Sequence, residues 1–183
     1  ITHLEHKMLE DAFPDATIVN VTPAIDRFML VKEPEQIQLM RQATALSDAA
    51  QEEVRLEARV GMTEAEIAGI AEYTMRSLGS EFAWTFTGGQ EVASGYRTWT
   101  GACTPSTRKI VQRGEFLVLD LHGMYNLMLG DVSHNAIMGE PTKEQKVVID
   151  AYVQSVNYLV GGLRPGRTIG EVAKDVRRFT VDQ

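Results

Sequence analysis

Two aspartates interrupt an apolar segment, and they constrain the fold of this chain more than any other feature. The segment FLVLDLHGMYNLMLGDVSHN, residues 116–135, is rich in Leu, Val and Met, yet it contains Asp120 and Asp131. Apolar runs of this kind, bounded by turn residues, are typical of buried β-strands. A carboxylate inside such a run therefore needs a partner that offsets its charge.

A hairpin would bring the two acids together. If residues 116–137 form a hairpin whose turn is Tyr125 and Asn126, Asp120 stands directly opposite Asp131. Like charges at opposed positions destabilise a sheet, and a divalent cation offsets the repulsion because it prefers carboxylate oxygen. The alternative is that both acids face solvent at a strand end, or that the turn lies elsewhere and the two never meet. The spacing leaves both readings open.

Helix patterns flank this segment on both sides and predict an α+β fold. The predicted helices are Pro34–Glu57, a helix capped by Thr63 and Glu66 that ends at Gly79, a helix starting near Thr142, and one in residues 168–176. Short aromatic or β-branched runs predict strands at residues 82–89, 97–101 and 115–123, with a further strand candidate at residues 16–21. Helices followed by strands and then helices indicate antiparallel pairing.

Length and composition narrow the function. A chain of 183 residues suits one domain, or one domain with a remnant of another. Its net charge of −7 argues against nucleic-acid binding, which needs clustered Lys and Arg. It has no apolar run of 18 residues, so no transmembrane helix is expected. The single cysteine, Cys103, fits a reducing, cytoplasmic setting, and without a neighbouring His in sequence it is not expected to be a catalytic thiolate.

Several motifs in order resemble the pita-bread superfamily, which contains Xaa-Pro aminopeptidases, prolidases, methionine aminopeptidases and the metal-free creatinases. Residues 117–145, LVLDLHGMYNLMLGDVSHNAIMGEPTKEQ, are similar to its metal-binding signature, in which ten residues separate two aspartates. The other matching stretches are FMLVKEPEQIQLMRQA, TPSTRKIVQRGEFLVLD and GLRPGRTIGEV. The resemblance implies a pita-bread fold, an antiparallel sheet with helices packed on one side, of which only part is expected in this chain.

The resemblance implies a metal-dependent hydrolase similar to Xaa-Pro aminopeptidase or prolidase. Asp120 and Asp131 would be two of five ligands to two divalent ions (Mn, Co, Zn or Fe), and a His and two Glu would follow in the second half of the fold. Residues 1–30 would be the end of an N-terminal domain and its linker, and residues 31–183 the first half of the catalytic domain. The implied partners are a small peptide or other small-molecule substrate and a second copy in a homodimer. Two carboxylates alone are expected to bind metal weakly.

The chain departs from the family pattern at two places. Family peptidases carry a His shortly before the Pro-x-x-Arg element, but here the region reads TGACTPSTRK and no His lies between His6 and His122. The Thr-Arg pair that follows the second aspartate is replaced in the stretch Val132–His134. These departures keep two alternatives open: a creatinase-like homologue with different chemistry, and a non-catalytic binding protein on the same fold. No catalytic residue and no substrate-binding residue is assigned.

Two histidines near the aspartates have competing interpretations. His122 shares a strand face with Asp120, so it is either an added ligand or proton carrier, or a partly buried His whose ring bonds to neighbouring backbone, which is the commoner case. His134 is expected on the face opposite to Asp131, because it lies three positions further along the strand and an odd spacing changes the face.

Four further residues stand out in the glycine-rich middle of the chain. Tyr96 and Arg97 occupy the stretch where the family builds part of its substrate pocket. Trp84 and Trp99 lie in strand-like runs and are expected in the core.

Overall fold

The computed structural model describes residues 2–81, 89–100 and 104–181. The chain divides into two compact parts, Ile1–Leu39 and Met40–Gln183. The first part holds α1 (His3–Ala12), α2 (Thr22–Leu30) and the beginning of α3 (Pro34–Glu57), and neither α1 nor α2 has a buried residue. The domain boundary expected near residue 30 stays a prediction.

The strand expected at residues 16–21 is wrong. These residues are exposed and have no regular secondary structure, and α2 begins directly after them with Pro23 in its first turn. A β-branched run forms a strand only where a neighbouring strand accepts its hydrogen bonds, and the described residues before Leu39 contain no such neighbour.

The helices follow their sequence signals closely. α3 has the predicted bounds, and α4 (Glu64–Ser77) begins with the predicted capping box of Thr63 and Glu66. α5 (Lys143–Gly162) is capped by Thr142, and α6 (Ile169–Val181) follows it. α5 and α6 pack as a pair in which the rings of Tyr158 and Phe179 stack with centroids 4.4 Å apart. None of the described helices is both long and apolar enough to cross a membrane.

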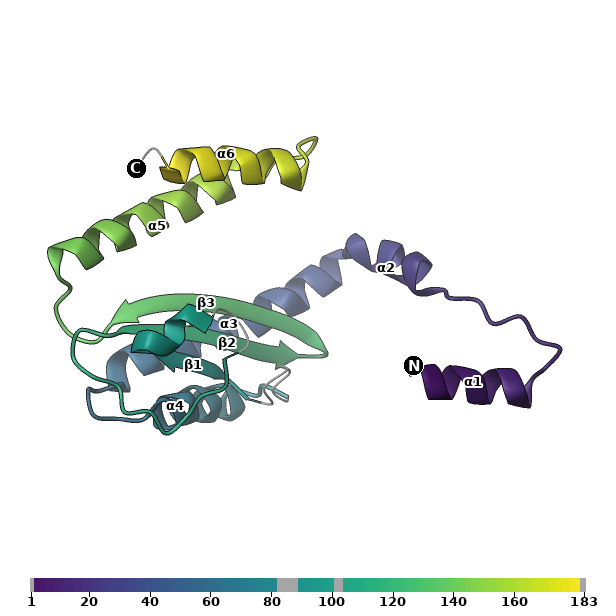
Figure 1. Ribbon diagram of the computed structural model, residues 1–183, viewed down its shortest axis with the longest axis horizontal. Helices are drawn as coiled ribbons and strands as arrows, with labels where there is room; N and C mark the ends of the chain where they lie inside the picture. Colours follow the sequence, from purple (N-terminus) through teal and green to yellow (C-terminus); the bar gives the residue numbers. More distant parts are fainter. Residues whose placement is uncertain (1, 82–88, 101–103, 182–183) are drawn as a thin grey trace. The chain divides into compact units, whose positions relative to one another are not determined.

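The described residues of the second part form an antiparallel sheet in the order β1, β2, β3 (Figure 1). The strands are β1 (Glu91–Ser94), β2 (Phe116–Tyr125) and β3 (Met128–Ile137). β2 confirms the strand predicted around residues 115–123. The α+β class, with an antiparallel sheet and helices packed against one of its faces, is confirmed.

The core lies between this sheet and two helices. Its apolar side chains come from one face of α3, one face of α4 and alternate positions of the strands. They include Leu46, Ala50 and Val54 of α3, Ile67, Ala71 and Met75 of α4, Val92 of β1, and Leu117, Leu119 and Leu121 of β2. The opposite face of β2, which carries Asp120 and His122, therefore points away from these helices.

The strand predicted at residues 97–101 is wrong. After β1 the chain turns at Gly95, whose φ is +56°, into a short 3₁₀ helix, η1 (Gly95–Thr100). Arg97 in this helix pairs with the buried carboxylate of Glu64, with Nε 3.0 Å from Oε2. Trp99 is 92% exposed, so its expected core position is also wrong. The ion pair to α4 stabilises η1 although the sequence of this stretch favours a strand.

Trp84 and the strand expected at residues 82–89 fall on a segment of which only Gly89 is described, and Cys103 also lies outside the described residues.

The turn of the β2–β3 hairpin differs from the expected one by one position. Asn126 and Leu127 form it, with φ of +47° and +62°. A two-residue hairpin turn requires such positive φ values, because only then does the turn match the twist of the strands. The partner of each β2 residue is consequently two positions later in β3 than expected. Asp120 opposes Ser133 rather than Asp131. A shift of two positions leaves every side chain on its expected face.

α3 lies unusually close to this hairpin. Gly123 of β2 opposes Gly130 of β3, and a Cβ atom on Gly130 would overlap the backbone of Ala43. The hydroxyl of Ser47 on α3 bridges the strands, because it accepts from Gly123 N at 2.7 Å and donates to Gly130 O at 2.5 Å. The two glycines and one hydroxyl thus hold the helix against the hairpin.

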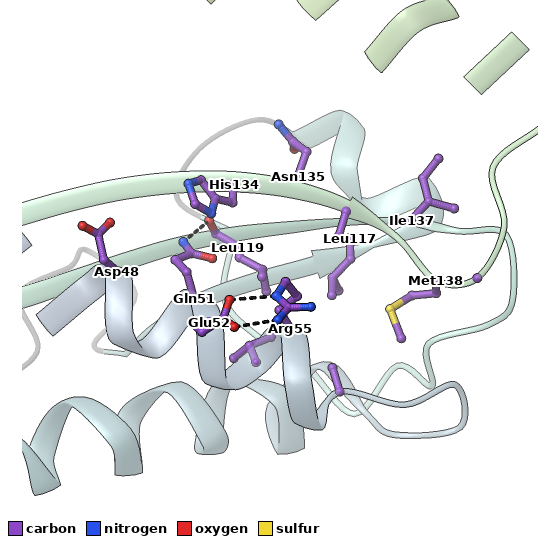
Figure 2. A pocket seen from close by; sticks show the side chains of 14 residues that line it. Asp48, Gln51, Glu52, Arg55, Leu117, Leu119, His134, Asn135, Ile137 and Met138 are labelled. Atoms are coloured by element: carbon purple, nitrogen blue, oxygen red, sulfur yellow. Dashed lines mark hydrogen bonds and ion pairs between the residues drawn. The ribbon is translucent and has the colours of Figure 1, made fainter. Parts of the chain in front are cut away.

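Gln51, one turn further along α3, makes a second bridge (Figure 2). Its Nε2 donates to Leu119 O at 3.2 Å on β2 and to Val132 O at 2.9 Å on β3. Beside it, residues of α3, β2 and β3 line an open pocket of about 600 Å³, and His134 is among them. His134 opposes the core residue Leu119, which confirms that it lies on the face away from Asp131.

We expect Gly130→Ala to destabilise the chain by at least about 2 kcal/mol, because overpacking against helix backbone cannot be relieved by a side-chain rotation. Urea unfolding of the chain measures this. Gly69→Ala is the matched control, since Gly69 lies at an exposed position of α4 with open space around its Cβ position, and the variant should gain about 0.5–1 kcal/mol. Equal stability of Gly130→Ala and the unmodified chain would contradict the close approach of α3.

Candidate metal centre

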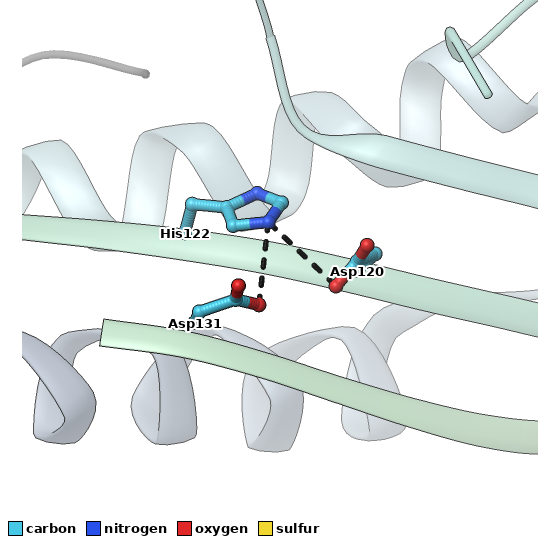
Figure 3. Close-up of side chains that lie close together, drawn as sticks. All are labelled: Asp120, His122 and Asp131. Carbon is cyan, nitrogen blue, oxygen red and sulfur yellow. Dashed lines mark ion pairs between the residues drawn. The ribbon is translucent and has the colours of Figure 1, made fainter. Parts of the chain in front are cut away.

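Asp120, His122 and Asp131 form one cluster on the face of the hairpin that points away from α3 (Figure 3). Asp120 and His122 come from β2 and Asp131 from β3, where it directly opposes His122. Each residue offers one potential ligand atom, and these atoms all lie within 4.8 Å of one another. The two aspartates predicted from the spacing are therefore close in space, although they are diagonal rather than opposed.

The imidazole of His122 faces both carboxylates. Its Nε2 lies 3.4 Å from Asp131 Oδ1 and 3.7 Å from Asp120 Oδ1, and its side chain is 9% exposed. The sequence reading in which this ring bonds to neighbouring backbone is wrong, because the buried Nδ1 has no hydrogen-bond partner among the described residues. The strand alternation that put His122 beside Asp120 was the correct signal, and the side chain belongs to the cluster.

The backbone of His122 is held by a side chain that the sequence did not single out. Gln90, next to β1, accepts a hydrogen bond from His122 N at 2.7 Å through Oε1 and donates to His122 O at 3.5 Å through Nε2. Gln90 is itself buried and anchored, since its carbonyl accepts from Ser106 Oγ at 2.7 Å and its N–H donates to Glu72 Oε1 at 3.1 Å. The amide thus extends the sheet ladder by one pair.

Glu91 adds a third carboxylate beside Asp120. It opposes Asp120 across the β1–β2 pair, is 5% exposed, and accepts a hydrogen bond from Thr104 N at 3.2 Å. The sequence reasoning missed this residue. The only signal was an acid in the run QEVAS, and the irregular stretch between β1 and β2 hides which residue it would oppose.

The electrostatics of the cluster favour a bound cation. Burial raises the pKa of the Asp120 carboxyl above its ordinary value of 3.8, the positive charge available at His122 lowers it, and the nearby charges of Asp131 and Glu91 raise it further. The net direction is upward, so the ionised form of Asp120 is disfavoured as the chain stands. A divalent ion would reverse this, because its charge stabilises the carboxylates that surround it.

The donor set fits a divalent metal. Two carboxylate oxygens and one imidazole nitrogen are ligand types that Mn, Fe, Co and Zn accept in proteins. Asp131 is 63% exposed, which leaves one side of the cluster open. A cavity of about 220 Å³ also reaches Asp120 and is lined by Glu91, Ala93, Thr98, Thr104, Val118 and Ser133.

Tyr96 and Arg97 are not part of the cluster. Arg97 pairs with Glu64 and donates to Pro105 O at 2.7 Å, which connects η1 to α4 and to the segment that leads towards β2. Tyr96 is 75% exposed, and its ring lies 5.9 Å from Lys109 Nζ. Their contacts stabilise the fold around the site.

Comparison with known proteins places this geometry in a family. The Xaa-Pro dipeptidase of Pyrococcus furiosus is 27% identical over 180 residues, which are 96% of this chain and 50% of that protein. The Xaa-Pro dipeptidase of Lactobacillus helveticus is 26% identical over 175 residues, 93% of this chain and 47% of that protein. The solved X-Pro aminopeptidase from Thermotoga maritima MSB8 matches with a TM-score of 0.90 and 27% identity, over all of this chain and 50% of its own.

The chain thus spans about half the length of the relatives that it matches. Their fold confirms the expected resemblance to the prolidase and aminopeptidase P group. A model of metallopeptidase family M24 matches residues 38–183, and because this covers most of the sequence, the chain belongs to metallopeptidase family M24.

Proposed function

We propose that this chain provides one half of the catalytic site of an Xaa-Pro peptidase-like metallohydrolase, with Asp120 and Asp131 as metal ligands. The observation that supports the proposal most is the convergence of these carboxylates and His122 within 4.8 Å in a chain of metallopeptidase family M24. The family resemblance implies a further His and two Glu ligands, which we assign to a part of the whole protein outside these 183 residues.

The two aspartates have different roles in the proposed site. Asp120 on β2, opposite Glu91 and with a side chain 19% exposed, is the fixed ligand, and the more exposed Asp131 faces the side on which a substrate can approach. A divalent metal, when bound, supplies Lewis acidity that polarises a scissile carbonyl and makes water a better nucleophile at neutral pH. The cavity beside Asp120 is small and partly polar, which suits a dipeptide-sized substrate.

The finer points of the proposal follow the family resemblance and the composition. The substrate is a small peptide with proline in its second position, and the ions are two divalent metals among Mn, Co, Zn and Fe. We further propose a homodimer in the cytoplasm.

One observation favours a second candidate, a metal-free site such as that of a creatinase-like homologue. His122 as an imidazolium would lie between Asp120 and Asp131 and would supply positive charge without any metal. The two candidates differ in one measurable property, which is the requirement of activity for a divalent ion.

We expect the protein encoded by the whole reading frame that contains these residues to release proline from Ala-Pro when Mn²⁺ or Co²⁺ is present. Asp131→Asn should lower kcat/KM at least about a hundredfold, because loss of a ligand costs more than the loss of a supporting contact. Asp48→Asn is the matched control, since Asp48 is an exposed carboxylate on α3. Full activity in the presence of a strong chelator would exclude the metallohydrolase and favour the metal-free candidate.

The isolated 183-residue chain, by contrast, should release no proline under the same conditions. Among its described residues the cluster offers three donors and no assigned general base, and activation of water needs an enclosed centre with a fixed coordination shell. Turnover by this chain that disappears in Asp120→Ala would show that the chain contains the whole catalytic apparatus.

Asp120→Asn should change the stability of the chain in opposite directions with and without metal. The pKa of Asp120 is raised in the folded state, so stability falls as the pH rises from about 3.8 towards that raised pKa and the whole penalty is present above it, whereas well below pH 3.8 the carboxyl is protonated in both states and the effect vanishes. In a chelator at pH 7 the variant should therefore unfold at higher urea than the unmodified chain, and the difference should shrink as the pH falls.

Saturating metal should reverse the order, because an ion at a hundred times its Kd stabilises only the unmodified chain, by about 2.7 kcal/mol. Asp48→Asn controls for the loss of one negative charge. The same order of stabilities with and without metal would contradict a role for Asp120 as a ligand.

A further inference from the structure

His122 lies where a third protein ligand would lie. This chain has at residue 122 an imidazole whose Nε2 points between Asp120 and Asp131 (Figure 3). The ring is nine-tenths buried, and its Nδ1 has no hydrogen-bond partner among the described residues. A ring that is buried and aimed at two carboxylates needs an explanation beyond packing.

The distances from Nε2 to the two carboxylates are longer than those of hydrogen bonds. A charge-assisted N–H···O hydrogen bond has a donor–acceptor distance of about 2.7–2.9 Å. In a tetrahedral site with bonds of about 2.0–2.2 Å, neighbouring ligand atoms are instead about 3.3–3.6 Å apart. Nε2 lies 3.4 Å from Asp131 Oδ1 and 3.7 Å from Asp120 Oδ1. These separations match two edges of a coordination polyhedron better than they match two hydrogen bonds.

Protonation of the ring is the competing explanation, and the surroundings of Nδ1 weigh against it. An imidazolium carries a proton on each nitrogen, and the one on Nδ1 would be buried without an acceptor among the described residues. A neutral ring that binds an ion through Nε2 also keeps its proton on Nδ1, but an unpaired N–H costs less in a neutral group than in a charged one.

The backbone that carries the ring is held in place before any ion binds. Gln90 bonds both backbone groups of His122, and Gly123, the next residue, donates to Ser47 of α3. The segment around His122 is thus tied to β1 on one side and to α3 on the other. A ligand held in this way loses little conformational entropy when it binds.

We propose that His122 is a direct ligand through Nε2, so that Asp120, His122 and Asp131 bind one divalent ion within this chain and favour Zn²⁺ or Co²⁺ over Mn²⁺. The inference rests on the proposed metal site and deepens it. It replaces the weak binding expected from two carboxylates with a three-ligand site. The preference follows because imidazole nitrogen suits Zn²⁺ and Co²⁺, whereas Mn²⁺ binds oxygen ligands comparatively well.

Calorimetric titration of the 183-residue chain with Zn²⁺, Co²⁺ and Mn²⁺ tests the proposal. We expect one ion per chain, with Zn²⁺ and Co²⁺ bound more tightly than Mn²⁺. His122→Gln places an uncharged amide near the position of Nε2 and should weaken Zn²⁺ and Co²⁺ at least about tenfold and Mn²⁺ less than about threefold. His134→Gln, the same substitution on the opposite face of the neighbouring strand, should leave all three affinities unchanged.

A spectroscopic measurement on the unmodified chain keeps the test independent of whether the variant folds. In ¹⁵N spectra of the histidine rings, Zn²⁺ should shift Nε2 of His122 to a metal-bound position and leave His134 where it was. An unshifted His122 ring at saturating Zn²⁺, or equal affinities in His122→Gln and the unmodified chain, would overturn the proposal.

Asp131→Asn separates this inference from the proposed function. Zn²⁺ binding that is lost in Asp131→Asn but kept in His122→Gln would leave the aspartate site standing and refute the role of His122. A chain that binds no ion, together with chelator-resistant activity of the whole protein, would refute both.

Discussion

The contact between α3 and the β2–β3 hairpin is the constraint on which the rest of the site depends. Gly123 and Gly130 allow the helix backbone to approach, and the Ser47 hydroxyl on α3 bonds to both strands. The glycine pair is adjacent to the pair of His122 and Asp131. Whatever fixes the glycines therefore fixes the separation of the donor atoms, because strand residues one position apart cannot move independently.

The structure buries carboxylates in two contrasting ways, and the contrast identifies the functional one. Glu64 is fully buried and accepts hydrogen bonds from the backbone and side chain of Ser94 and Thr107 as well as the ion pair of Arg97. Such a group is stabilising because its charge is compensated on every side. Asp120 lies among other carboxylates instead, and its ionised form is disfavoured. A sheet that keeps such a cluster despite its cost indicates a site for a cation.

Local sequence signals predicted where the helices and strands lie. The strand register and the cross-strand partners depend on pairing between distant residues, which those signals do not specify. Thr63 with Glu66 fixed a helix start because a capping box needs only neighbours in sequence. The predicted hairpin register was wrong because the turn includes Leu127 with a positive φ, which a leucine side chain disfavours. No turn motif in the sequence indicated this position. The two aspartates still lie on the same face and close together, since the predicted register differed from the observed one by two positions, an even number. Gln90 and Glu91 were missed because their partners on β2 lie about thirty positions away, beyond any periodic pattern.

The role inferred for His122 also bears on the histidine that family peptidases carry before the Pro-x-x-Arg element and this chain lacks. A ring nitrogen that coordinates an ion has no lone pair left to accept a proton, and the other nitrogen of His122 is buried away from solvent. His122 as a ligand is therefore no substitute for the missing proton carrier. The proton steps of any hydrolysis then need groups other than the three donors, and no such group is assigned among the described residues.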